Sequence, residues 1–277
     1  MIVVEIKQKK RQIAAFATTC LFRDKSLVAK PFYHGDGLRT TNILIRFAEK
    51  GFNMKNKNFV IDDGFRAELV RSAEFKGIFE IPYINPPKKI VLPKDTIPFS
   101  LIKRSKDYSE FVVFYEHDTK FSDVISATDE YLDELKKFPG VVSPDCSLYR
   151  DMPLTLQIAN TYMNRAIGHY LQLHGIYVIP NVRWGDERSY TTSVLPEKFA
   201  FAGLPKHSIV SVGTYGCIQG KENKRYFREG LTAMLDELEP EYVLIYGSMP
   251  DSIFGDLADR TTFVHYKDWT TKMRGGD

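Results

Sequence analysis

The sequence predicts an α/β fold of TIM-barrel-like form, complete or incomplete, over residues 107–277. Three observations lead to this prediction: short apolar runs recur along the chain, helical segments separate them, and no G-x-G-x-x-G phosphate loop follows any run. The runs show little alternation of apolar and polar residues, which is typical of strands covered on both faces in a parallel sheet. We therefore expect about six βα-type strands and favour a barrel over a doubly wound sheet.

The predicted strands start roughly 20–35 residues apart, which is the spacing of βα units. They are Phe111–Tyr115, Gly140–Val142, Ile176–Ile179, Ser208–Val212, Tyr242–Tyr246 and Thr262–Tyr266. Pro and Gly delimit the helical segments between them, as these residues favour helix starts and ends. The predicted helices are Phe121–Phe138, Pro153–His174 and Lys224–Leu238. In the second helix one apolar face is expected to lie on the sheet, formed by Leu154, Ile158, Tyr162, Ala166 and Tyr170.

Residues 1–106 are predicted to form an α+β N-terminal extension rich in basic residues and prolines. Residues 1–60 contain twelve Lys and Arg against four Asp and Glu, a net charge of +8, which leaves −5 on the remainder. Such a segment is typical either of a solvated basic surface or of binding to nucleic acid or a nucleotide. Closely spaced prolines between Ile81 and Pro98 predict an extended chain. Further predicted elements are strands at Ile13–Phe16 and Phe59–Ile61 and helices at Thr41–Glu49 and Gly64–Glu74.

Composition is that of a soluble globular protein. Of the 277 residues, 43% are hydrophobic and 26% charged, and no run approaches the roughly 18 apolar residues that a membrane helix needs. The first residues lack the basic and apolar regions of a secretory signal, so we expect a cytoplasmic location without a membrane partner. Cys20, Cys146 and Cys217 form no C-x-x-C pair, which argues against a disulfide framework and against structural zinc.

Polar side chains follow the predicted strands, where ligands bind in α/β folds. Asp118, Asp145 and Asp186 are candidate catalytic residues, because converging carboxylates perform acid–base chemistry or hold Mg²⁺ as a cofactor. Candidate ligand-binding residues combine charged groups with aromatic platforms: His117, Arg183, Trp184, Glu187, Tyr190, Tyr215 and Tyr246. The alternative interpretation is structural: Asp145 and Asp186 cap the following helices, and Arg183 pairs with one of them.

Two cysteines also follow predicted strands. Cys146 would be a nucleophile if a base such as His117 lay close to it, and is otherwise a small buried thiol; the same two interpretations hold for Cys217. No Walker loop, nucleophile elbow, kinase signature or zinc spacing occurs in the sequence, so no motif identifies a reaction.

A family resemblance rests on three segments: Pro144–Pro153, Leu156–Tyr162 and Val178–Asp186. Together they resemble the uncharacterised "domain of unknown function 4417" family. Shorter matching segments are Ile97–Phe99, Ser211–Cys217, Phe227–Leu231 and Pro240–Gly247, so the resemblance covers about residues 97–247. It implies a setting in bacteria, phages or mobile elements, and it brings no catalytic residues with it. The family pattern has an aromatic residue where this chain has Cys146, which argues against a nucleophilic role for that thiol.

These observations favour a phage- or mobile-element-type cytosolic protein that binds a phosphorylated or nucleic-acid ligand at its strand ends, with or without hydrolytic chemistry. A second hypothesis is a non-catalytic factor that binds a host or element-encoded protein in replication or anti-defence, since fold does not determine function. A third is a carbohydrate-active barrel, which needs two carboxyl groups roughly 5–9.5 Å apart near Trp184.

Overall fold

The structure is a computed structural model that describes residues 66–275. The chain divides into two compact units, Met1–Asp62 and Asp63–Asp277, and all described residues belong to the second. The elements predicted at Ile13–Phe16, Thr41–Glu49 and Phe59–Ile61 lie outside the described residues. The described part of the helix predicted at Gly64–Glu74 forms a single 3₁₀ turn, η1 (Ala67–Val70).

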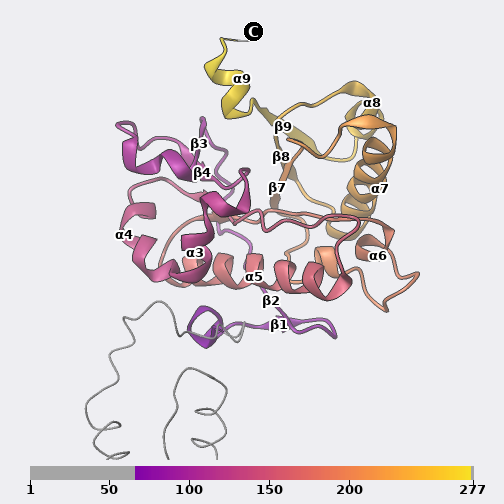
Figure 1. Cartoon of the computed structure of the whole chain (residues 1–277), viewed down its shortest axis with the longest axis horizontal. Helices are drawn as coiled ribbons and strands as arrows, with labels where there is room; N and C mark the ends of the chain where they lie inside the picture. Colours follow the sequence, from indigo (N-terminus) through magenta and orange to yellow (C-terminus); the bar gives the residue numbers. More distant parts are fainter. Residues whose placement is uncertain (1–65, 276–277) are drawn as a thin grey trace, which may run out of the picture. The chain divides into compact units, whose positions relative to one another are not determined.

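Parallel strands form the centre of the second unit (Figure 1). One sheet has four strands in the order β3-β4-β5-β6, the other has three in the order β7-β8-β9, and every neighbouring pair in both is parallel. Their bounds are β3 Thr96–Pro98, β4 Phe111–Val113, β5 Val141–Val142, β6 Val178–Ile179, β7 Ile209–Gly213, β8 Tyr242–Tyr246 and β9 Thr262–Tyr266. A separate antiparallel pair, β1 (Phe75–Lys76) and β2 (Ile81–Pro82), precedes them. The α/β prediction with parallel sheets is therefore confirmed.

An isolated parallel bridge between Asn181 and Ser211 connects the two sheets. It consists of Val182 N donating to the Ser211 carbonyl and Ser211 N donating to the Pro180 carbonyl, both at 2.8 Å. Strand order thus follows chain order from β3 to β9. Because the strands are parallel, their carboxyl ends meet at one edge, and the loops that leave those ends are neighbours.

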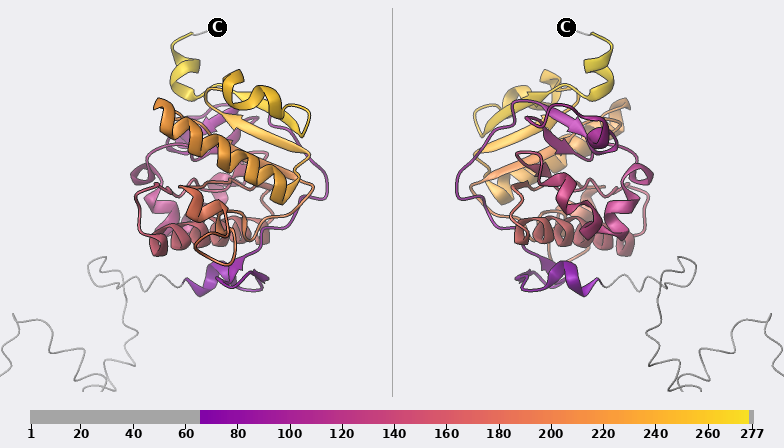
Figure 2. Two further views of the ribbon diagram at one scale, coloured as in Figure 1. Left: turned by 90° about the vertical axis from the view of Figure 1, so that its right-hand side faces the viewer. Right: turned by 90° about the vertical axis from the view of Figure 1, so that its left-hand side faces the viewer.

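Helices cover the outer faces of the sheets. The longest two are α5 (Leu154–Leu173), which packs with residues of β4 to β6, and α7 (Gly220–Leu238), which lies along β7 and β8 (Figure 2). The shorter helices are α3 Ser122–Ser126, α4 Leu132–Leu135, α6 Glu187–Tyr190, α8 Asp251–Phe254 and α9 Trp269–Met273. In the part of the chain that the structure describes, no helix combines the length and apolar content that crossing a membrane requires.

The core extends on both sides of the strands. At β4, Val112 and Phe114 pack outward against the helices, whereas Phe111, Val113 and Tyr115 point to the opposite side. This inward cluster also contains residues of β5 to β8: Val142, Ile179, Ile209, Leu244 and Tyr246. Both sheets therefore bury one common set of side chains, which holds their carboxyl ends close to each other.

A closed TIM barrel is not shown. Within residues 66–275, no strand pairing joins β3 to β9, so the sheet is open at that point. Two side chains make contacts across the opening: the Tyr266 hydroxyl donates to the Pro93 carbonyl at 2.7 Å, and Lys272 forms ion pairs with Asp95 and Glu110.

The helix predicted at Phe121–Phe138 is divided into α3, the 3₁₀ turn η4 (Thr128–Tyr131) and α4. The backbone leaves helical geometry at Ala127, where φ is −146° and ψ is 57°. The hydroxyl of Thr128 donates to the Val124 carbonyl at 2.7 Å. Such a hydroxyl competes with main-chain donors for helical carbonyls, so Thr128 weakens the helix beside the point of interruption.

Helix α5 buries a polar face. The apolar face predicted from the four-residue spacing is only half-buried at its start, at Leu154, Ile158 and Tyr162. The buried residues at this end are instead Gln157, Thr161, Asn164 and Arg165. Arg165 donates to the carbonyls of Asn181, Ala200 and Ala202 at 2.8, 2.9 and 3.1 Å. These bonds compensate the burial of its charge and fix the loop that follows β6.

Candidate functional site

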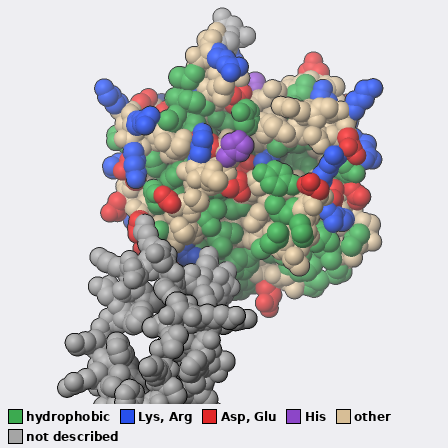
Figure 3. Space-filling view, viewed as in Figure 1, with side chains coloured by type: hydrophobic (Ala, Val, Ile, Leu, Met, Phe, Trp, Pro, Cys, Tyr) green, Lys and Arg blue, Asp and Glu red, His purple; other side chains and the backbone are tan. Residues whose placement is uncertain are grey.

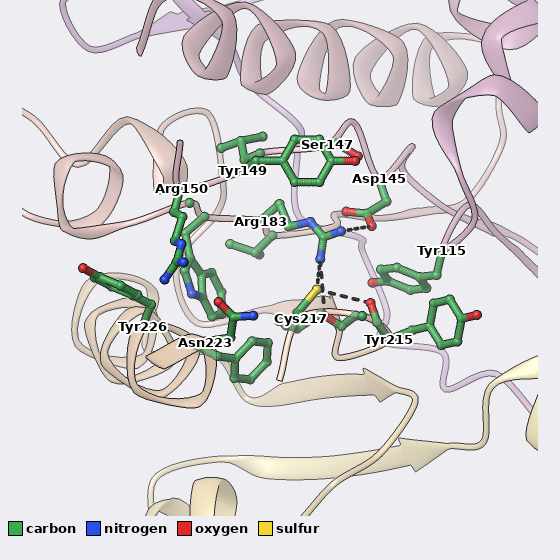
Figure 4. A pocket seen from close by; sticks show the side chains of 18 of the residues that line it. Tyr115, Asp145, Ser147, Tyr149, Arg150, Arg183, Tyr215, Cys217, Asn223 and Tyr226 are labelled. Atoms are coloured by element: carbon green, nitrogen blue, oxygen red, sulfur yellow. Dashed lines mark hydrogen bonds and ion pairs between the residues drawn. The ribbon is translucent and has the colours of Figure 1, made fainter. Parts of the chain in front are cut away.

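A pocket of about 460 Å³ opens at the carboxyl ends of β4 to β7 (Figure 4). Its lining consists of residues 115–117 after β4, 145 and 147–151 after β5, 182–185 after β6, 212–213 and 215–217 at the end of β7, and 223, 226 and 227 of α7. Four consecutive parallel strands thus contribute loops to it. This is the edge at which ligands bind in α/β folds.

Arg183 lies at the centre of this pocket. Its Nη2 is 2.9 Å from Asp145 Oδ2, and its Nη1 donates to Cys217 Sγ at 2.7 Å and to the Gly213 carbonyl at 3.5 Å. Its Nε is buried and has no hydrogen-bond partner among the described residues. One guanidinium therefore connects the loops after β5, β6 and β7, and its Nε–H donor stays without a partner in the described part of the chain (Figure 4).

Asp145 is the buried carboxylate of the pocket, with 4% of its surface exposed. Asn181 Nδ2 donates to its Oδ1 at 2.8 Å, and Arg183 occupies its other oxygen. Burial raises the pKa of Asp145, while Arg183 and the hydrogen bond from Asn181 act in the opposite direction. A carboxyl group with a raised pKa takes up and releases a proton closer to neutral pH, which is the property of an acid–base group.

The pKa values of Arg183 and Cys217, which contact each other beside Asp145, shift for different reasons. Burial lowers the pKa of Arg183, but the charge of Asp145 more than offsets it, and the pKa lies above its ordinary value. Burial raises the pKa of Cys217, against the effect of Arg183, so this thiol keeps its proton at neutral pH. Burial likewise raises the pKa of Cys146, which is only 3% exposed; its geometry is that of a small buried thiol.

A hydrogen-bond network holds the amide of Asn181 in place. The Tyr115 hydroxyl donates to Asn181 Oδ1 at 3.0 Å and lies 2.7 Å from Ser211 Oγ. The Tyr115 ring stacks on Tyr246, with 4.9 Å between centroids and 19° between planes. Because Oδ1 of Asn181 is occupied by the tyrosine, its Nδ2 is directed at Asp145.

The sequence profile of the family described as "Domain of unknown function (DUF4417)" matches residues 73–267. The chain belongs to this family. The family predicted from the sequence is therefore confirmed, and the match extends beyond residues 97–247 on both sides. All loops that line the pocket lie within the DUF4417 domain.

Two relatives of the chain are encoded by mycobacterial phages. It is 29% identical over 210 residues to the "Gene 1 protein" of Mycobacterium phage L5, covering 72% of this chain and 86% of the relative. It is 28% identical over 175 residues to the "Gene 1 protein" of Mycobacterium phage D29, covering 62% of this chain and 61% of the relative. No solved structure matches the chain. The phage setting implied by the resemblance agrees with these relatives.

Of the three predicted catalytic carboxylates, Asp145 lines the pocket of the DUF4417 domain. Asp118 lies behind the lining and accepts hydrogen bonds from the main-chain N and the hydroxyl of Ser147, at 3.1 and 2.6 Å. Asp186 accepts from Arg188 N at the start of α6 and pairs with the Arg188 guanidinium at 2.8 Å. Asp186 thus has the geometry of a helix cap, and its catalytic assignment stays a prediction.

The predicted ligand-binding residues fall into two groups. Those that line the pocket are His117, Arg183, Trp184 and Tyr215. The others lie outside its lining: Glu187, Tyr190 and Tyr246. Tyr190 is buried and donates to Glu229 at 2.9 Å, and Tyr246 accepts from Trp269 N at 2.9 Å, so both hydroxyls are occupied. Trp184 is only 6% exposed and forms part of the pocket floor against Phe227.

A second wall of the pocket was missed by the sequence interpretation. Arg150 Nη1 pairs with Glu222 Oε2 at 2.5 Å, which brings it to the first turn of α7. Asn223 and Tyr226 follow on the same face of this helix, three residues apart, and Tyr149 precedes Arg150 in the loop after β5. The glycines of the loop before α7 could have predicted this wall. A Gly-rich turn between a strand and a helix commonly brings the start of the helix to a ligand.

The charge around the pocket is mixed. On the face shown in Figure 3, basic and acidic side chains are interspersed. Within the pocket, Glu116 pairs with Lys120 at 3.0 Å, and Asp145 pairs with Arg183. Among residues 66–275, no group of three or more His, Cys, Asp and Glu side chains is arranged to hold a metal ion.

Proposed function

We propose that the DUF4417 domain binds a phosphorylated ligand in the strand-end pocket. The observation that carries the proposal is the presence of two arginines, Arg183 and Arg150, on different loops of one pocket. Arg183 has a buried Nε–H donor without a partner among the described residues, and the Arg150 side chain, which is 45% exposed, is held at the pocket by its ion pair with Glu222. Guanidinium groups bind phosphate oxygens through charge-assisted hydrogen bonds, which are stronger than neutral ones.

The start of α7 supports the same ligand class. This helix has 19 residues, and its N-cap residue Gln219 makes no side-chain capping bond. Gly216 and Gly220 have φ angles of 74° and 77°, which non-glycine residues rarely adopt, and a Cβ on either would meet no atom within 4 Å. Main-chain N–H groups at an uncapped helix start complement an anion.

Asp145 adapts the pocket to an anion. A phosphate near Arg183 adds negative charge beside this carboxyl group, whose pKa burial already raises. Binding therefore favours the protonated carboxyl, which leaves the Arg183 charge for the ligand. In a hydrolytic version of the function, we assign to Asp145 the exchange of a proton with the leaving group or with water.

Two further parts of the hypothesis have separate support. A nucleic acid as the phosphorylated ligand is favoured by the net charge of +8 on residues 1–60, which lie outside the described residues. A barrel-like closure of the sheet is supported by the contacts of Tyr266 and Lys272 with the segment around β3.

Calorimetric titration with inorganic phosphate and glycerol 3-phosphate, at constant ionic strength, tests the proposal. Arg150→Gln should weaken binding about tenfold, because a hydrogen bond to a charged group contributes about 1.5 kcal/mol. Arg260→Gln is the matched control, since Arg260 is an exposed arginine paired with Asp236 outside the pocket. The proposal fails if neither compound binds, or if both variants weaken binding equally. The rival function, a non-catalytic factor for a protein partner, predicts no phosphate binding at this pocket.

A further inference from the structure

Exposed aromatic side chains gather at the strand-end pocket. Among residues 66–275, the two most exposed are Tyr149, at 56%, and Tyr215, at 55%, and both line it. The other exposed aromatic residues, Phe75 at 44% and Tyr108 at 41%, lie elsewhere. A phosphate group is charged and not planar, so it does not stack on an aromatic ring. The two exposed rings therefore indicate that the ligand has a second, planar part.

Unoccupied hydrogen-bonding groups also line this pocket. The Asn223 side-chain amide has no hydrogen-bond partner within the described part of the chain, and neither do the hydroxyls of Tyr149 and Tyr226. Asn223 and Tyr226 are three residues apart on α7, so both face the pocket. An amide presents a donor and an acceptor side by side, which matches the edge of a nucleobase.

Arg150 connects this wall to the proposed phosphate site. Arg150 forms an ion pair with Glu222, which is the residue directly before Asn223 in the first turn of α7. In the chain, Arg150 directly follows Tyr149. Figure 4 shows Arg150, Asn223 and Tyr226 together on one side of the pocket, with Arg183, Asp145 and Cys217 on the other. The volume of about 460 Å³ lies in the range of pockets that enclose one small ligand.

We infer that the pocket recognises a single 5′-phosphorylated nucleotide unit, free or at the end of a strand. Its phosphate binds the arginines, its base stacks on Tyr149, and Asn223 hydrogen-bonds the edge of the base. This inference rests on the proposed phosphate binding and extends it to the base. A sugar phosphate is the competing ligand class, because sugars also stack on tyrosine, but it offers no planar edge for the amide.

The test compares the four ribonucleoside 5′-monophosphates, ribose 5-phosphate, inorganic phosphate and a short 5′-phosphorylated oligonucleotide, titrated into the full chain. At least one nucleotide should bind about tenfold more tightly than ribose 5-phosphate, the gain expected from stacking one base. Tyr149→Ala should remove this advantage and leave phosphate affinity unchanged, whereas Tyr149→Phe should keep it. Asn223→Ala should reduce the differences between the four bases. Tyr108→Ala, an exposed tyrosine outside the pocket, is the control.

The outcomes separate the two proposals. If ribose 5-phosphate and all nucleotides bind equally through Arg150, phosphate binding stands and recognition of the base is overturned. If Tyr149→Phe loses as much affinity as Tyr149→Ala, stacking is overturned. If no phosphorylated compound binds, both proposals fail. If the oligonucleotide binds more tightly than the matching mononucleotide, the ligand is the 5′ end of a strand. If the mononucleotide binds more tightly, the ligand is a free nucleotide.

Discussion

Arg183 Nη2 lies 2.9 Å from Asp145 Oδ2, although the two residues follow different strands, β5 and β6. The pair is largely enclosed, with side-chain exposures of 20% and 5%. Neighbouring parallel strands bring the two loops together, and Asn181 and Cys217 complete the surroundings.

The Asp145–Arg183 pair should be strongly coupled. Asp145→Asn leaves the Arg183 charge without its partner, and we expect the free energy of unfolding to fall by about 2–3 kcal/mol, slightly less than for a fully buried pair. Asp145→Asn combined with Arg183→Met should lose at least about 1 kcal/mol less than the sum of the single changes. Urea unfolding measures these values. The exposed pair Asp236–Arg260 is the control and should couple by less than about 1 kcal/mol; equal coupling in both pairs would contradict the prediction.

The raised pKa of Asp145 makes stability depend on pH in a defined direction. Between the ordinary value of 3.8 and the raised folded value, the native state binds more protons than the unfolded state. The free energy of unfolding contributed by Asp145 therefore decreases as pH rises through this window. Urea unfolding of the wild type and of Asp145→Asn at a series of pH values should show this decrease in the wild type only. A wild type that gains stability relative to the variant would mean that Arg183 outweighs burial.

Strand predictions succeeded where apolar runs were long. Those at Tyr242–Tyr246 and Thr262–Tyr266 agree with β8 and β9 residue for residue. Strand β3 was not predicted because it ends in Pro98 and lies in the proline-rich segment. Proline is tolerated there because β3 is an edge strand of its sheet, where one side of the main chain needs no partner. Periodicity in the sequence does not distinguish an edge strand from other extended chain.

The site could be predicted only in part. Asp145 and Arg183 directly follow strands, and chain order alone brings them to one edge. Arg150 and Asn223 were missed for different reasons. Arg150 reaches the pocket through its pairing with Glu222, a contact across elements. Asn223 lies one residue before the predicted helix Lys224–Leu238, whereas α7 begins at Gly220 and includes it.

Close packing at Gly230 should control the shape of the pocket. A Cβ at this position of α7 would lie 2.2 Å from Trp184 Nε1, so Gly230→Ala forces the indole to move. We expect a loss of about 1–2 kcal/mol in unfolding free energy, after the gain in helix propensity is included, and a change in Trp184 fluorescence. Gly255→Ala is the control: its Cβ would lie 3.6 Å from Asp251 Cβ, and its φ of −57° suits alanine. Equal behaviour of the two variants would contradict close contact at Trp184.

Alkylation of the cysteines tests access to the proposed phosphate site. Burial raises the pKa of both Cys146 and Cys217, so both should react slowly with iodoacetamide near neutral pH and faster as pH rises. Cys217 lines the pocket and should react first, while Cys146, at 3% exposure, is the internal control. Inorganic phosphate should slow the reaction of Cys217 and leave Cys146 unchanged, because a bound anion both covers the thiol and disfavours its thiolate. Peptide mass spectrometry assigns each site, with potassium chloride at equal ionic strength as the reference. Identical Cys217 rates in phosphate and chloride would mean that the anion does not bind beside Arg183. Faster alkylation of Cys146 than of Cys217 would contradict the expected order of access.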